Sequence, residues 1–137
     1  MLPTGIRRGA FTMSIQEHRR LVFGIPALRE AVQIHMPDIA PSLVPRGAQV
    51  KSVVVVTEPL SARIRVMAQG APEPSEVDLT ALHLGAVLIR RCKALGIPLP
   101  RNARKSLEGD PSGVTMRVSL THEVPAKSQL SAHRIGA

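Results

Sequence analysis

The sequence predicts a small α+β protein with one hydrophobic core, and three observations support this fold class. A β-branched run at 53–56 indicates a strand, which a second strand follows after a short turn. Apolar residues at helical spacing over 75–95 indicate a long helix, and strict alternation at 114–120 indicates a third strand. The chain has 137 residues, of which 44% are hydrophobic, so it suits one domain with tails.

The chain is expected to consist of a flexible leader at 1–13, a single domain at 14–121 and a flexible tail at 122–137. Proline and glycine punctuate the leader, and the tail lacks apolar periodicity. Met13 is a plausible alternative start, so the sequence leaves open whether residues 1–12 belong to the mature protein.

The N-terminal part of the domain is predicted to form two short helices. Ser14-Ile15-Gln16-Glu17 has the spacing of a capping box, which favours a helix over 14–23. Pro26 suits the first turn of a second helix, which Pro37 is expected to end, and a linker follows at 38–47. The apolar stripe of the second helix repeats at helical spacing in Leu28, Ala31, Val32 and His35.

The middle of the chain is predicted to form an antiparallel β-hairpin with strands at 50–57 and 62–68. Successive side chains of a strand point to opposite faces. Alternation in the second strand therefore places Ile64 and Val66 on one face, and Arg63, Arg65 and Met67 on the other.

A capped helix from Ser75 to Leu95 is the element around which the other predicted elements are arranged. Gly96 stands where helices take a left-handed residue, and Pro98 and Pro100 follow as a rigid corner. The predicted apolar face of the helix consists of Leu82, Gly85, Ile89 and Cys92, flanked by Ala81, Leu88 and Leu95. A turn at 109–113 then leads into the third strand.

The sequence carries no catalytic or metal-binding motif, so we expect neither an enzyme nor a cofactor. The five histidines are far apart, and none has the partner at i+4 or the paired cysteines of a zinc site. Cys92 is the only cysteine, which excludes an intramolecular disulfide and suits a reducing cytosol; its place on the apolar face favours a structural role. The nearly apolar run at 81–89 is too short to span a bilayer, so we expect a cytoplasmic protein without a membrane partner.

The formal net charge of +8 favours acidic partners such as nucleic acid, although arginine-rich and lysine-poor usage is also typical of GC-rich genomes. The candidate nucleic-acid-binding residues are Arg90, Arg91, Arg101, Arg104 and Lys105. If Pro100 begins a helical turn, Arg101, Arg104 and Lys105 share one face and can contact phosphates. The alternative is a solvated helix end that only keeps the surface charged.

Two resemblances cover this region. Residues 94–107 resemble the turn and second helix of a helix-turn-helix, with the third strand as a wing, although Pro98 and Pro100 depart from that pattern. A helix followed by Ile97-Pro98-Leu99-Pro100-Arg101, then Lys105-Ser106-Leu107 and a strand, resembles small uncharacterised proteobacterial proteins over about residues 78–120. The second resemblance implies no activity and no site residues.

Two functions follow as hypotheses. The first is a small non-catalytic protein that binds the DNA or RNA backbone through the basic cluster, joined by Arg63 and Arg65 of the hairpin. The second is a protein–protein interaction or homo-oligomeric scaffold module, in which the hairpin edge at 53–56 pairs with another chain. Recognition of single-stranded RNA by base stacking is disfavoured, because Phe11 and Phe23 are the only aromatic residues.

Overall fold

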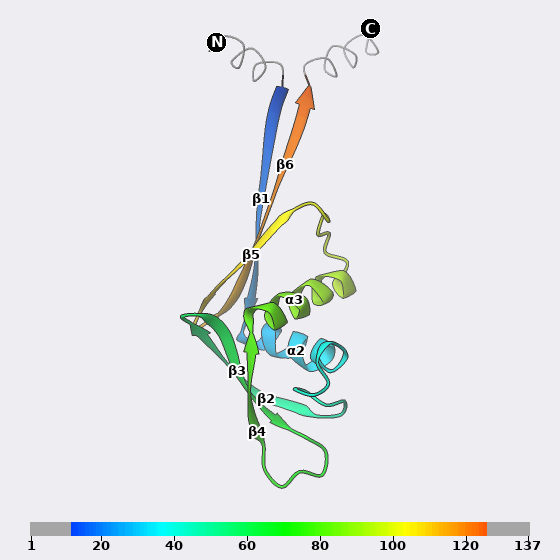
Figure 1. Cartoon of the computed structure of the whole chain (residues 1–137), viewed down its shortest axis with the longest axis vertical. Helices are drawn as coiled ribbons and strands as arrows, with labels where there is room; N and C mark the ends of the chain where they lie inside the picture. The colour runs from blue at the N-terminus through cyan, green and yellow to red at the C-terminus, as the bar shows by residue number, and fades with distance from the viewer. Residues whose placement is uncertain (1–11, 126–137) are drawn as a thin grey trace.

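The computed structural model describes residues 12–125, which contain two helices and six strands (Figure 1). The elements in chain order are β1 (Thr12–Gly24), α2 (Ile25–Ile39), β2 (Gln49–Thr57), β3 (Leu60–Met67), β4 (Ser75–Thr80), α3 (Ala81–Leu95), β5 (Arg104–Asp110) and β6 (Gly113–Pro125). The predicted α+β class is confirmed. No helix within 12–125 is long and apolar enough to cross a membrane.

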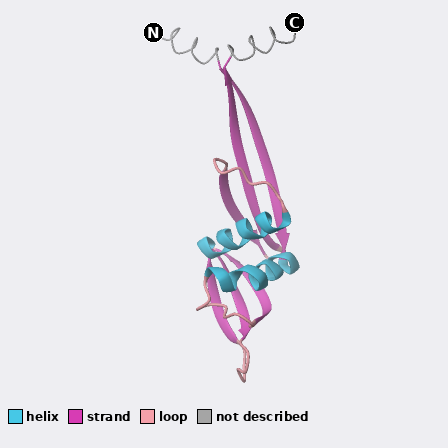
Figure 2. Cartoon of the chain, turned by 90° about the vertical axis from the view of Figure 1, so that its right-hand side faces the viewer, coloured by secondary structure: helices cyan, strands magenta, loops and turns pink. Residues whose placement is uncertain are grey.

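The strands form two three-stranded antiparallel sheets, ordered β1-β6-β5 and β2-β3-β4. The two helices lie beside each other at the middle of the molecule, with one sheet extending toward each end (Figures 1 and 2). The first sheet is much longer, because β1 and β6 pair along their whole length from Gly24 and Gly113 to Thr12 and Pro125.

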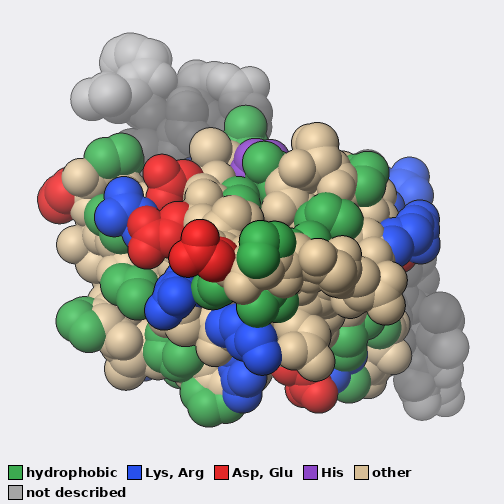
Figure 3. Space-filling model, turned by 90° about the horizontal axis from the view of Figure 1, so that it is seen from below, with side chains coloured by type: hydrophobic (Ala, Val, Ile, Leu, Met, Phe, Trp, Pro, Cys, Tyr) green, Lys and Arg blue, Asp and Glu red, His purple; other side chains and the backbone are tan. Residues whose placement is uncertain are grey.

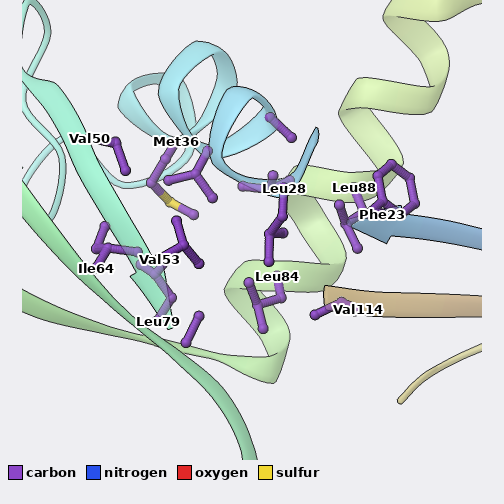
Figure 4. Packing of buried hydrophobic residues seen from close by; sticks show 14 of the residues in the cluster. Phe23, Leu28, Met36, Val50, Val53, Ile64, Leu79, Leu84, Leu88 and Val114 are labelled. Carbon is purple, nitrogen blue, oxygen red and sulfur yellow. The ribbon is translucent and has the colours of Figure 1, made fainter. Parts of the chain in front are cut away.

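One aliphatic core joins the helices to both sheets (Figure 4). Its largest fully buried side chains are Leu28, Met36, Ile64, Leu79, Leu84, Leu88 and Met116. Phe23 supplies the aromatic ring of the described core, and no polar or charged residue of the described chain is buried. Each sheet therefore uses one face for packing, while its other face contacts solvent.

The predicted hairpin is confirmed as β2 and β3, and the third predicted strand lies within β6. Ile64 and Val66 are buried and Arg63 and Arg65 are exposed, as alternation requires. Gly96 adopts a left-handed φ of 75° at the C-cap of α3. The turn between β5 and β6 lies where glycine and proline predicted it. In this turn, hydrogen bonds from Ser112 to the Asp110 carboxylate lower the pKa of Asp110.

The helix predicted over 14–23 is wrong, because this segment is β1. Its residues have capping-box spacing but no helical apolar stripe, and alternation places Leu21 and Phe23 on the core side and Val22, which is 67% exposed, on the other. A complete ladder of pairs with β6 outweighs the local capping signal. The second helix is confirmed, but it continues past the expected stop at Pro37, which is buried in its last turn, to Ile39.

The long helix is correct only in its C-terminal part. Residues 75–80 form β4, which pairs with β3, and α3 begins after Thr80. The Thr80 hydroxyl accepts from the backbone N–H of His83 at 3.3 Å, and the Thr80 N–H donates to the His83 ring at 3.1 Å. Cys92 and Leu88 are buried as expected, but Leu82 is 86% exposed. The buried stripe consists of Leu84, Val87, Leu88 and Cys92.

The helix-turn-helix resemblance is wrong, because the would-be second helix is strand β5, an edge of the first sheet. Its sequence, Arg-Lys-Ser-Leu-Glu-Gly-Asp, has few apolar residues and therefore gave no strand signal. The predicted linker at 38–47 is partly anchored, since Val44 is fully buried. Residues 122–125, assigned to the tail, belong to β6; the rest of the tail and residues 1–11 of the leader lie outside the described chain.

Alanine substitutions at two glycines test this fold. We expect Gly113→Ala to lower the free energy of unfolding by about 2–4 kcal/mol, because its φ is 152° and an added Cβ would lie 2.1 Å from the Phe23 carbonyl oxygen. Gly85→Ala should instead raise it by about 0.5–1 kcal/mol, since Gly85 is helical and its nearest neighbour would be 3.8 Å away. Urea unfolding followed by circular dichroism measures both, and equal effects would contradict the structure.

Candidate nucleic-acid interface

The solvent side of the first sheet, here called the outer face, is a flat polar surface. Its residues stand in three cross-strand rows: His18–Ser119–Arg104, Arg20–Arg117–Ser106 and Val22–Thr115–Glu108. The opposite side of the same strands carries Phe23, Val114 and Met116, which are buried in the core. None of these outer-face side chains is buried, so no described element of the chain covers them.

Three arginines are close together on the outer face. Arg20 stands directly opposite Arg117, and directly paired Cβ atoms are about 5 Å apart. Arg104 occupies the diagonal position to Arg117, about 7–8 Å away. Arg117 pairs with Glu108 at 2.6 Å, and both side chains are about half exposed. Asp110 and Glu123 also occupy positions on the outer face, so its three arginines stand against three acids in all, and the positive charge is a local cluster around Arg117.

The solvent side of the second sheet is balanced in charge. Arg63 pairs with Asp78 at 3.1 Å, which raises the pKa of Arg63, and Arg65 stands opposite Glu76 in the register. Viewed from the end that this sheet forms, basic and acidic side chains are intermixed (Figure 3). The arginines of the hairpin therefore face acids of the same chain, and they are poorer candidates for phosphate contacts than the sequence indicated.

Beyond the start of β5, strands β1 and β6 continue as a two-stranded ribbon that projects from the molecule (Figure 1). The outer face of this ribbon carries the uncharged polar side chains of Ser14, Gln16 and Thr121 and the carboxylate of Glu123. Its other side carries apolar residues and a side-chain hydrogen bond between His122 and Glu17 at 3.1 Å. A two-stranded ribbon has the width that the major groove of B-DNA admits.

The five predicted site residues do not form one surface. Arg91 pairs with Glu30 of α2 at 3.2 Å and its side chain is only 18% exposed, so it joins the two helices. Arg90 borders a shallow depression together with His35 and Lys93. Both residues of α3 therefore turn toward α2.

The remaining three predicted site residues lie near the start of β5 but point in different directions. Arg101 is exposed in the loop before β5, and Arg104 lies on the outer face. Lys105 points the other way, and its ammonium donates to the Pro100 and Ala103 carbonyls at 3.3 Å each. The predicted shared helical face of Arg101, Arg104 and Lys105 is wrong, because neighbouring strand residues point to opposite sides.

Sequence reasoning missed Arg20 and Arg117 as members of the site. Arg20 lies in the segment that the sequence predicts to be helical, and Arg117 lies at a polar position of the predicted third strand. Their proximity arises from a pairing between residues almost a hundred positions apart. The available signal was one outward-facing arginine in each of two paired strands. This signal can be used only when the strand that pairs with β1 is known.

His35 and Cys92 are titratable residues that lie away from the outer face. His35 is half buried, and its Nε2 atom has no hydrogen-bond partner within the described chain. Burial lowers the pKa of His35, and the charges of Arg91 and Arg90 lower it further. Burial raises the pKa of Cys92, against a smaller opposing effect of Arg19. No group of three or more His, Cys, Asp or Glu residues in 12–125 could hold a metal ion.

No protein-family model matches this chain, and no match is found among curated proteins or solved structures. The resemblance to small proteobacterial proteins therefore stays a prediction.

We expect Cys92 to be unreactive toward a thiol reagent in the native protein at neutral pH, because it is fully buried and its pKa is raised. Labelling with a chromogenic disulfide should be slow in buffer and complete within seconds in denaturant. Rapid labelling of the folded chain would show that α3 opens easily.

His35 should make the protein less stable in mild acid. Its pKa is lowered in the folded state, so the unfolded chain binds the proton first, and stability falls as the pH drops below about 6.5. Replacing His35 with Gln should remove this part of the pH dependence in thermal unfolding between pH 7 and 5. The same change at His18, which is exposed on β1, serves as the control and should leave the dependence in place.

Proposed function

We propose that this protein binds the phosphate backbone of nucleic acid through the outer face of the β1-β6-β5 sheet. The observation that carries the proposal is the juxtaposition of Arg20, Arg117 and Arg104 on an uncovered surface. Like charges directly opposite each other destabilise a sheet, and an anionic partner removes that repulsion. Guanidinium groups can bind phosphate through two parallel hydrogen bonds.

Duplex nucleic acid suits this surface better than single strands. Single-stranded ligands are usually held by aromatic side chains on which bases stack, and the outer face presents none. The polar side chains of the projecting ribbon include Gln16 and Thr121, which can hydrogen-bond to base edges or phosphates. The proposal is therefore a backbone-directed DNA-binding protein in which the ribbon enters a groove.

The alternative of pairing through the hairpin edge has less support. The side-chain amide of Gln33 in α2 already donates to the Ala48 carbonyl and accepts from the Val50 N–H, each at 2.7 Å. The first part of the β2 edge is thereby occupied. Val54 remains 58% exposed farther along the strand, and it is the observation that keeps self-association as a second candidate.

Anisotropy of a labelled random duplex, titrated over a range of salt concentrations, tests the first proposal. With about three phosphate contacts the log–log slope should be near −2.7. The double variant Arg20→Gln/Arg104→Gln should bind at least tenfold more weakly and reduce the slope to about −0.9.

The matched control is Arg63→Gln/Arg65→Gln, which removes the same charge from exposed strand positions of the other sheet. It should leave the affinity within about twofold of the original protein. If both double variants weaken binding equally, the attraction depends only on net charge and the outer face is not the site.

A further inference from the structure

An open groove with a volume of about 530 Å³ lies between α3 and β5, on the side of the first sheet opposite the outer face. Gly85 and Ala86 of α3 and Leu107 and Met116 of the sheet line its length. Leu82, which is 86% exposed, stands on its rim. The apolar surface of α3 is thus wider than the stripe that the core buries, which explains why its predicted apolar face and its buried stripe differ.

The groove has one polar end and one apolar end. Leu107 of β5 faces Gly85 of α3 and lies 3.8 Å from the position of an added Cβ, while Leu60 lies beside Gly109 farther along β5. Leu60 closes the groove at the end near Ala81, and Lys105 lies at the other end, toward Ile89. Ala81 and Ile89 are eight helical positions apart, which corresponds to about 12 Å.

Lys105 gives the groove its charge. Its ammonium donates to the Pro100 and Ala103 carbonyls, and these two bonds hold the group in place while one of its three N–H donors remains for a ligand. No acidic residue lines the groove, so the charge is uncompensated there. A mostly apolar site with one well-placed charged group is typical of small-molecule binding.

From this arrangement we infer that the groove binds an aliphatic carboxylate of medium chain length. The carboxylate lies at Lys105, and the chain runs past Gly85 toward Leu60. The absence of side chains at Gly85 and the small side chain of Ala86 let the chain approach the helix closely. This binding site is independent of the proposed nucleic-acid surface, because β5 separates the two.

Isothermal titration of the full chain with octanoate, hexanoate and octanol tests the inference. Each buried methylene contributes a nearly constant free energy, so hexanoate should bind roughly 15-fold more weakly than octanoate. Octanol, which lacks the charge, should also bind more weakly. Lys105→Met should reduce the affinity for octanoate to that for octanol while leaving octanol unchanged.

Two variants locate the ligand. Gly85→Leu fills the middle of the groove and should abolish binding, whereas Ala94→Leu, on an exposed position of the same helix outside the groove, should not change it. Leu82→Asp places a negative charge on the exposed rim at the apolar end without altering the core, and it should weaken octanoate and octanol alike, because the aliphatic tails of both lie there. Leu82→Asp keeps the test decisive if Gly85→Leu does not fold.

Three results would overturn the inference. One is octanoate binding that is unaffected by both Gly85→Leu and Leu82→Asp, and another is equal affinity for octanol and octanoate in the original protein. The third is a dimer, seen by light scattering, that Leu82→Asp converts to a monomer and that octanoate does not dissociate. In that case a second copy of the chain occupies the groove.

Discussion

The pairing of β1 with β6 is the interaction on which most of the structure depends. It joins the two ends of the described chain in an unbroken ladder from Gly24 and Gly113 to Thr12 and Pro125. Strand β6 is the middle strand of its sheet, so without β1 it would keep only β5. A two-stranded sheet of this kind is marginally stable, and Phe23 would lose its place in the core. Because the partners are so distant in sequence, this contact is expected to form late in folding.

What could be predicted from the sequence was the local structure. Valines at 53–56, the left-handed Gly96 and the turn before Gly113 each act through neighbouring residues, and the structure has them where they were predicted. Of the three missed strands, only β1 has a partner remote in sequence, whereas β5 and β4 pair with strands next to them in the chain. β1 and β5 both pair with β6, and β4 pairs with β3 in a segment whose cap signal at Ser75 favoured a helix. β5 was missed although its neighbouring strand and the turn between them were predicted, because its few apolar residues give no alternating pattern.

The candidate site depends on the same remote pairing of β1 with β6. Of the residues chosen from the sequence, Arg104 lies on the outer face, while Arg91 is engaged with Glu30 and Lys105 turns toward the groove. Arg20 and Arg117 meet only through the register of the sheet. A run of basic residues in the sequence is divided between surfaces by the alternation of a strand and the rotation of a helix. Conversely, positive charges far apart in sequence can be concentrated by one ladder.

The position of the two ends of that ladder also determines how the molecule responds to force. Thr12 and Pro125 are paired at the tip of the ribbon, so the two ends of the described chain leave from one point. A load applied between them acts across the strands rather than along them. The hydrogen bonds of the ribbon then break one after another, as in a zipper, and none shares the load with the next. The protein is therefore mechanically weak along this axis, whatever its thermodynamic stability.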